Sequence, residues 1–180
     1  MVSLARLVNA RTFFEFGTYL GIQTLNIAMN VPSLVNIYTL DLDYESFKNV
    51  KQHKPDHIVS LKHFEYERRL AFLGSPFENM IQRLYSDSNE FDFSDFEGEI
   101  DIVYVDGGHD LGTLRSDTEN AFKMLRPDSL SCIAWHDYGN PNYPDLTQYL
   151  DDLSIEYDIY HVEETWAAFY LQKGEDIDFK

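Results

Sequence analysis

The chain of 180 residues contains little cysteine and few basic residues. Its single cysteine, Cys132, leaves no intrachain disulfide and no cysteine-based zinc site, and its place in an apolar run predicts a buried, inert thiol. Lysine and arginine number 14 against 31 acidic residues, which gives a net charge of −17 and a pI of about 4.5. Because nucleic-acid-binding proteins present basic patches, this charge argues against a nucleic acid as partner.

Long apolar runs are also missing. No stretch approaches the roughly 20 residues of a membrane-spanning helix. Residues 1–14 lack the apolar segment and the small-residue cleavage site of a secretory signal. We therefore expect a soluble, cytoplasmic protein with no membrane partner. The length predicts a single domain over residues 1–180.

Strand and helix patterns alternate along most of the chain. The final two strands are separated by three residues only, so they must pair as an antiparallel hairpin. The alternation before them predicts a mostly parallel sheet that binds ligands at the carboxyl ends of its strands. Residues 44–80 fit the pattern least well and predict a helix with a long loop. We expect strands at Thr12–Phe16, 35–42, 81–84, 100–105, 130–135, 156–162 and 166–172, and helices at 22–29, 114–125 and 146–153.

A glycine turn follows the first strand. Gly17 and Gly21 lie between this strand and the next helix, where the backbone can pass close to a ligand and the helix N-terminus offers N–H groups. We expect a valine at Gly17 to block ligand binding and to leave the protein folded. Asp41 ends the second strand, 24 residues later, where a carboxylate can accept hydrogen bonds from both ribose hydroxyls. Asp43 is the alternative for this role.

Polar clusters also end the later strands. The strand over residues 100–105 is apolar throughout, as expected of a strand buried on both faces, and it ends in the sequence Asp106-Gly-Gly-His109. The following strand ends in His136-Asp137-Tyr, and the short strand before them leads to Asp87 and Ser88.

The order and spacing of these motifs resemble those of class I S-adenosylmethionine-dependent methyltransferases. The likeness extends over about residues 12–173. It is greatest to the small-molecule and sugar O-methyltransferases, whose fourth strand ends in Asp-Gly-x-His. The resemblance implies a Rossmann-like three-layer α/β sandwich with a mostly parallel seven-stranded sheet of order 3-2-1-4-5-7-6 and a C-terminal antiparallel hairpin. It also implies methyl transfer from S-adenosylmethionine to a hydroxyl of a small molecule, such as a sugar.

The resemblance assigns roles to individual residues. Glu15 and Gly17 would border the methionine part of the cofactor, Asp41 the ribose, and Asp87 with Ser88 the adenine. Asp106 and His109 would face the methyl group, where His109 is placed to act as general base because an imidazole can accept a proton at neutral pH. The implied cofactor-binding positions are Glu15, Gly17, Thr18, Tyr19, Gly21, Asp41, Leu42, Asp87, Ser88 and Asp106.

A divalent cation such as magnesium is the second implied cofactor. Metal-dependent relatives hold it with an aspartate at the position of Asp106 and a pair of acids at the end of the fifth strand. Here that strand supplies His136 and Asp137, and magnesium prefers oxygen ligands to an imidazole. The sequence therefore leaves both a metal-dependent and a metal-free enzyme open.

Other interpretations remain. His53, His57 and His63 could suggest a metal site, but their spacing matches no helical ligand pair. Several aromatic residues are expected to pack in the core, with an acceptor pocket as the alternative. These aromatic residues are Phe64, Tyr66, Phe72 and Phe77.

Two other functions compete with methyl transfer. They are a non-catalytic cofactor-binding domain and a nicotinamide-dependent oxidoreductase, although the turn has few glycines for a dinucleotide. Few residues precede the first strand to cover the cofactor site, so a second subunit of a homodimer could cover it.

Overall fold

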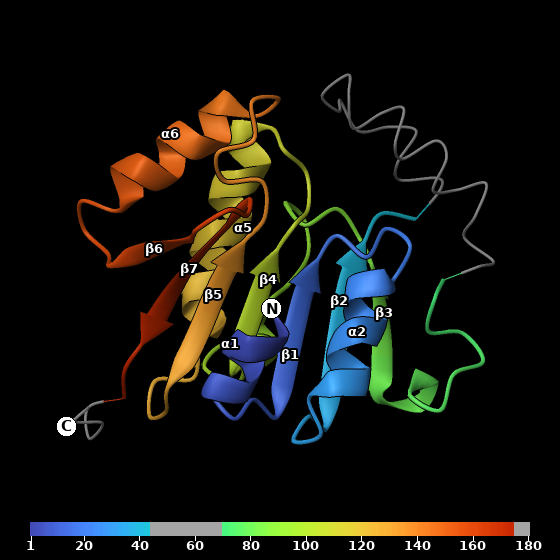
Figure 1. Cartoon of the computed structure of the whole chain (residues 1–180). Coiled ribbons are helices and arrows are strands. Elements are labelled where there is room, and N and C mark those ends of the chain that lie inside the picture. Colours follow the sequence, from blue (N-terminus) through green and yellow to red (C-terminus); the bar gives the residue numbers. More distant parts are fainter. Residues whose placement is uncertain (44–69, 175–180) are drawn as a thin grey trace.

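The computed structural model describes residues 1–43 and 70–174, and a seven-stranded sheet forms its centre (Figure 1). The strand order is β3-β2-β1-β4-β5-β7-β6. Strands β1 to β5 run parallel, whereas β7 is antiparallel to both β5 and β6. The predicted strand order and the terminal hairpin are thus confirmed. The strands are β1 Thr12–Phe16, β2 Asn36–Asp41, β3 Ile81–Tyr85, β4 Ile102–Val105, β5 Ser131–Trp135, β6 Ile159–Val162 and β7 Ala167–Gln172.

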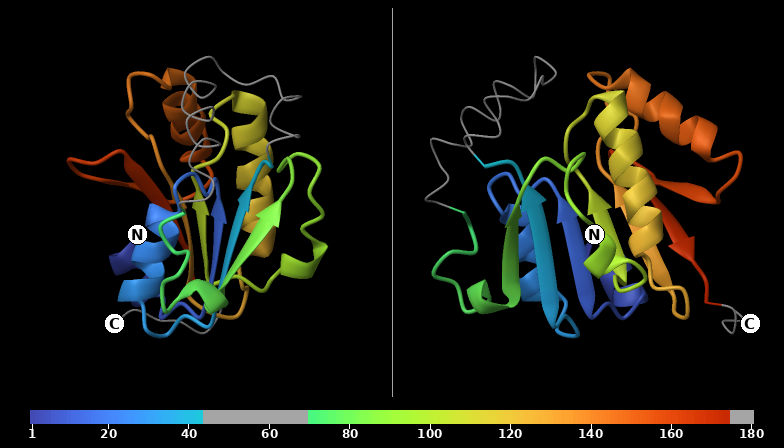
Figure 2. Two further views of the ribbon diagram at one scale, coloured as in Figure 1. Left: turned by 90° about the vertical axis from the view of Figure 1, so that its right-hand side faces the viewer. Right: turned by 180° about the vertical axis from the view of Figure 1, so that it is seen from behind.

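Helices cover both faces of this sheet, which makes the three-layer sandwich predicted above (Figure 2). Helices α1 (Val2–Leu7) and α2 (Ile22–Asn30) pack on one face. Helices α5 (Leu111–Met124) and α6 (Pro144–Leu153) pack on the other. Two short 3₁₀ turns, η2 (Glu78–Met80) and η3 (Ser94–Phe96), precede β3 and β4.

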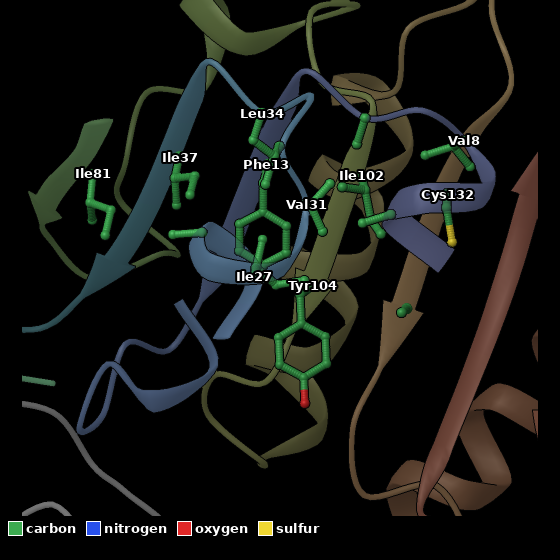
Figure 3. Packing of buried hydrophobic residues seen from close by; sticks show 14 of the residues in the cluster. Val8, Phe13, Ile27, Val31, Leu34, Ile37, Ile81, Ile102, Tyr104 and Cys132 are labelled. Atoms are coloured by element: carbon green, nitrogen blue, oxygen red, sulfur yellow. The ribbon is translucent and has the colours of Figure 1, made fainter. Parts of the chain in front are cut away.

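The first strand explains why the core has two halves. Successive side chains of a strand point to opposite faces, so Phe13 joins the cluster under α1 and α2 while Phe14 joins the cluster under α5 and α6. In the first cluster Phe13 lies beside Ile27 of α2, and Cys132 of β5 lies near Val8 at the end of α1 (Figure 3). The thiol of Cys132 is buried, as predicted.

Several boundaries differ from the expected ones. Helix α1 was not predicted, since a six-residue helix depends on packing more than on its own pattern. Helix α5 begins three residues before the expected position because Asp110 caps its first turn, accepting hydrogen bonds from two backbone N–H groups. Strand β4 is shorter than expected, and Ile100 forms only an isolated bridge with Leu125. Among the described residues, no helix has the length and apolar character needed to cross a bilayer.

The parallel strands bring their carboxyl ends to one edge of the sheet, the upper edge in Figure 1. Phe16, the last residue of β1, is in register with Leu40 of β2 and Val105 of β4, and Val105 is in register with Trp135 of β5. The residues that follow these strands therefore lie side by side. This carboxyl edge is where open α/β sheets bind their ligands.

Candidate active site at the carboxyl edge of the sheet

The glycine turn is held tightly between β2 and β4. The N–H of Gly17 donates to the carbonyl of Leu40 at 2.8 Å, and the N–H of Asp106 donates to the carbonyl of Phe16 at 3.1 Å. Gly17 has a φ of 86°, a region that favours glycine. A Cβ at this position would collide with the backbone carbonyl of Asp106. The glycine is therefore needed by the fold itself, which corrects the expectation that a valine here would leave the protein folded.

Gly21 fulfils a second local requirement of the turn. It has a φ of 66° and caps the N-terminus of α2. A Cβ there would lie 2.6 Å from the ring of Phe72. The ring of Phe72 thus packs against Gly21. Phe72 is a buried core residue, and Phe77 packs against the same core. Both aromatic residues serve packing, which was the interpretation favoured from the sequence.

Asp41 joins the end of β2 to the glycine turn. Its Oδ2 accepts hydrogen bonds from the backbone N–H groups of Thr18, at 3.1 Å, and Tyr19, at 2.9 Å. Its Oδ1 accepts one from the N–H of Leu42 at 2.8 Å. These three hydrogen bonds make Asp41 a fixed part of the glycine turn, with its carboxylate at the carboxyl edge of the sheet.

Glu15 lies beneath the turn and is 1% exposed. Its Oε2 accepts hydrogen bonds from the hydroxyls of Thr24, at 2.5 Å, and Thr39, at 2.8 Å. The Thr39 hydroxyl also lies 2.6 Å from that of Thr18. Burial raises the pKa of Glu15 to about 8, although both hydroxyls act to lower it. The carboxyl of Glu15 thus forms part of the supporting layer under the turn.

The loop after β3 lies beside the N-terminus of α5. Asp87 accepts a hydrogen bond from the N–H of Asn89 at 2.9 Å. The Asn89 side chain in turn donates to the Thr113 hydroxyl of α5 at 3.2 Å. The loop begins next to Asp41, whose carbonyl accepts from the N–H of Ser86 at 3.1 Å. Asp87 and Ser88 are both half-buried here.

Asp106, His136 and Asp137 form one cluster at the ends of β4 and β5. Their ligand atoms lie within 4.8 Å of one another. The Nδ1 of His136 is 3.0 Å from Asp137 and 3.3 Å from Asp106, although neither contact has the angle of a hydrogen bond. These two carboxylates raise the pKa of His136 to about 10. The ring is therefore an imidazolium at neutral pH.

Asp137 binds a second histidine on its other side. The Nε2 of His109 lies 2.8 Å from Oδ2 of Asp137, and the Asn140 amide donates to Oδ1 at 2.6 Å. Burial would raise the pKa of Asp137, but the contacts with His109, His136 and Asn140 outweigh it and hold the pKa well below its usual range. The ring of Tyr143 stacks on His109, with centroids 4.1 Å apart. His109 is thus fixed in position and orientation.

The donor set at this cluster does not fit magnesium. Two carboxylates and one imidazole are available, whereas Mg²⁺ prefers an octahedral shell of oxygen ligands. The imidazolium of His136 also lies between the two carboxylates, where it already supplies positive charge. We therefore assign no step of the chemistry to a metal ion.

The structure thus brings the predicted residues of the glycine turn, Asp41, Asp87 and the Asp106 cluster to one edge. It adds Tyr143, Asn140 and the buried Asp117 of α5, none of which the sequence singled out. Asp117 had a recognisable signal, since it lies three residues after Leu114 on the apolar face of its helix. The predictions for His53, His57, His63, Phe64 and Tyr66 fall outside the described residues.

The strand order and the carboxyl-edge site define the class of protein, a Rossmann-like methyltransferase fold. A profile of a methyltransferase domain family matches residues 14–138, from β1 to just beyond β5. The chain therefore belongs to this methyltransferase domain family. No curated protein sequence matches it.

Solved structures of low sequence identity share the fold. A protein from Staphylococcus aureus described as a caffeoyl-CoA O-methyltransferase is 13% identical with a TM-score of 0.68, covering 96% of this chain and 80% of its own. The O-methyltransferase TomG from Streptomyces achromogenes, solved with SAM, is 16% identical with a TM-score of 0.58, covering 96% and 78%. The methyltransferase domain of bacterial CtHen1-C is 14% identical with a TM-score of 0.61, covering 96% and 94%.

Proposed function

We propose that this protein transfers the methyl group of S-adenosylmethionine to a hydroxyl oxygen of a small molecule, such as a sugar. The family match supports methyl transfer, and one observation carries the oxygen acceptor. The His109–Asp137 pair, 2.8 Å apart, lies at the same sheet edge as the glycine turn and Asp41. A base is needed there because a hydroxyl must lose its proton as its oxygen gains a methyl group.

The donor would lie across the ends of β1 and β2. Asp41 would accept a ribose hydroxyl while it holds the Thr18 and Tyr19 amides. The methionine part would pass the glycine turn, above Glu15. The sulfonium methyl would then face Asp106 and His109 at the end of β4. The surrounding carboxylates favour the cationic sulfonium and disfavour an anionic acceptor.

The contact with Asp137 indicates which ring nitrogen of His109 carries a proton. The pKa of Asp137 is lowered, so Asp137 is ionised and can only accept a hydrogen bond. The Nε2 of His109 therefore carries the proton of a neutral ring, and Nδ1 is the basic nitrogen. In the transfer step the acceptor oxygen bonds to the methyl carbon, the carbon–sulfur bond breaks with its electron pair on sulfur, and the hydroxyl proton moves to Nδ1.

Cofactor binding is the first test of this proposal. We expect S-adenosylhomocysteine to bind the purified protein in titration calorimetry and NAD to show no binding. Asp41→Ala should weaken binding about tenfold to a hundredfold, since a hydrogen bond to a charged group contributes about 1.5–3 kcal/mol. Asp43→Ala is the matched control and should bind normally. Loss of binding in Asp43→Ala alone would move the ribose role to that residue.

Turnover separates an enzyme from a binding domain. The protein should convert S-adenosylmethionine to S-adenosylhomocysteine in the presence of a panel of sugars and small phenols. Tight binding without turnover on any hydroxyl compound would favour the non-catalytic alternative. Binding of NAD in place of S-adenosylhomocysteine would favour an oxidoreductase and contradict the proposal.

A further inference from the structure

Asp117 is a buried carboxyl that the proposed chemistry does not use. It lies on α5 and is 1% exposed, facing the sheet. Neither of its oxygens makes a hydrogen bond of normal geometry with any of residues 1–43 and 70–174. A buried polar group without a partner is costly, by about 1–3 kcal/mol. Such a group therefore suggests a contact that forms in another state of the protein.

The neighbours of Asp117 belong to the loops after β3 and β4. A Cβ on Gly107 would lie 2.9 Å from its Oδ2, so the carboxyl lies directly under that residue. The hydroxyl of Ser88 is near enough to lower the pKa of Asp117, while Asp87 and Asp110 act to raise it. Burial is the largest influence and raises the pKa to about 7. The carboxyl of Asp117 is thus placed between two loops that meet above it.

The position of Asp41 indicates which part of the cofactor would lie over these loops. Asp41 contacts the glycine turn on the β1 side and Ser86 on the β3 side. If its carboxylate holds the ribose, the methionine part lies over the glycine turn. The base attached to the ribose then lies toward β3, over Asp87 and Ser88. The Asp87 carboxylate and the oxygen of the Ser88 hydroxyl both offer acceptors for the amino group of an adenine ring.

We propose that Asp117 is a positioning residue for the adenine ring. In the cofactor-bound state the carboxyl of Asp117 takes the Ser88 hydroxyl as its hydrogen-bond partner, and this bond holds the loop after β3 in place for the base. The inference rests on the proposed use of S-adenosylmethionine. It assigns to Asp117 no contact with the cofactor. Its effect passes through Ser88, and it concerns recognition of the base only.

Calorimetry with two ligands tests this role. Wild-type protein, Asp117→Ala, Asp117→Asn, Ser88→Ala and the double variant are titrated with S-adenosylhomocysteine and with S-inosylhomocysteine, which carries an oxygen in place of the adenine amino group. We expect Asp117→Ala and Ser88→Ala each to weaken S-adenosylhomocysteine binding about tenfold, equivalent to about 1.4 kcal/mol. The double variant should lose no more S-adenosylhomocysteine affinity than the weaker-binding single variant, because the two substitutions remove the same contact. The same single substitutions should weaken binding of S-inosylhomocysteine less than they weaken binding of S-adenosylhomocysteine.

Thr118→Val is the matched control. Thr118 follows Asp117 on α5 and accepts a hydrogen bond from the Trp135 indole at 3.0 Å, so its loss lowers stability without touching either loop. Normal affinity in this variant separates positioning from general destabilisation. If Asp117→Ala does not fold, Ser88→Ala and Asp117→Asn carry the test.

Two results would overturn the inference. Unchanged S-adenosylhomocysteine affinity in Asp117→Ala and Ser88→Ala would remove the role, and so would fully additive losses in the double variant. Failure of the wild-type protein to bind S-adenosylhomocysteine would instead reject the proposed function, and the inference with it.

Discussion

At the edge of the sheet where the parallel strands begin, Asp101 has a complete set of partners. Its Oδ2 accepts hydrogen bonds from the backbone N–H groups of Arg11, at 2.8 Å, and Thr12, at 3.0 Å. Its Oδ1 accepts one from the Arg126 guanidinium, also at 3.0 Å. A buried charge that is paired and hydrogen-bonded in this way ties three segments of the chain together.

The acids at the carboxyl edge have different partners from those of Asp101. Hydroxyls bind Glu15, histidines contact Asp106 and Asp137, and Asp117 lacks a hydrogen bond of normal geometry. Within the two described ranges, neither lysine nor arginine pairs with any of these four acids. Shifted pKa values, such as those of Glu15, Asp117 and Asp137, concentrate at functional sites. The comparison indicates that one edge was built for stability and the other for ligand chemistry.

Removal of His109 should have the largest effect at the carboxyl edge. General-base assistance contributes about 10²–10⁴ in rate, so His109→Ala should lower turnover by that factor while S-adenosylhomocysteine affinity stays nearly unchanged. The control is His161→Ala, since His161 lies in the exposed hairpin, where its ring contacts the carbonyl of Thr165 and packs beside Tyr138. Wild-type turnover in His109→Ala would refute the assignment of the base.

Removal of Asp101 should show the opposite behaviour. Asp101→Ala leaves two backbone N–H groups and the Nε–H of Arg126 without their acceptor, so we expect a loss of about 3 kcal/mol in the free energy of unfolding. Urea denaturation measures this loss, and calorimetry should show unchanged S-adenosylhomocysteine affinity. The exposed Asp95 provides the control substitution. If Asp101→Ala weakened cofactor binding more than it lowered stability, the assignment of a mainly stabilising role to this edge would be wrong.

Stability should also depend on pH through the carboxyl edge. Burial raises the pKa of Glu15 to about 8 and that of Asp117 to about 7, so the folded protein keeps protons that the unfolded chain releases above about pH 4.5. The free energy of unfolding should therefore fall as the pH rises from about 4.5 to 8, by at most about 1.4 kcal/mol per pH unit for each group. Glu15→Gln should flatten this profile, and Asp95→Asn should leave it unchanged. Parallel profiles for Glu15→Gln and wild type would contradict this origin.

The strands themselves were predictable because most of their residues are apolar or β-branched, whereas their order was implied by the resemblance of the motifs to those of class I methyltransferases. The apolar run before Asp106 is an example of such a strand. Contacts between distant segments were not predictable. Tyr143 stacks on His109 from a different loop, and Gly17 is required by the backbone of Asp106, which lies 89 residues further along the chain. Only the folded structure shows either contact.

Chelation should have the smallest effect. The cluster of Asp106, His136 and Asp137 places an imidazole where magnesium prefers an oxygen ligand, and the pKa of His136, raised by the two carboxylates to about 10, keeps its ring positively charged between them. We therefore expect EDTA to leave turnover unchanged once an acceptor is known. His136→Asp would supply the missing oxygen ligand and remove the imidazolium, so this variant should gain a dependence on added Mg²⁺ that the wild-type protein lacks. Loss of wild-type turnover in EDTA, restored by Mg²⁺, would show instead that the carboxyl edge requires a metal ion to balance its charge.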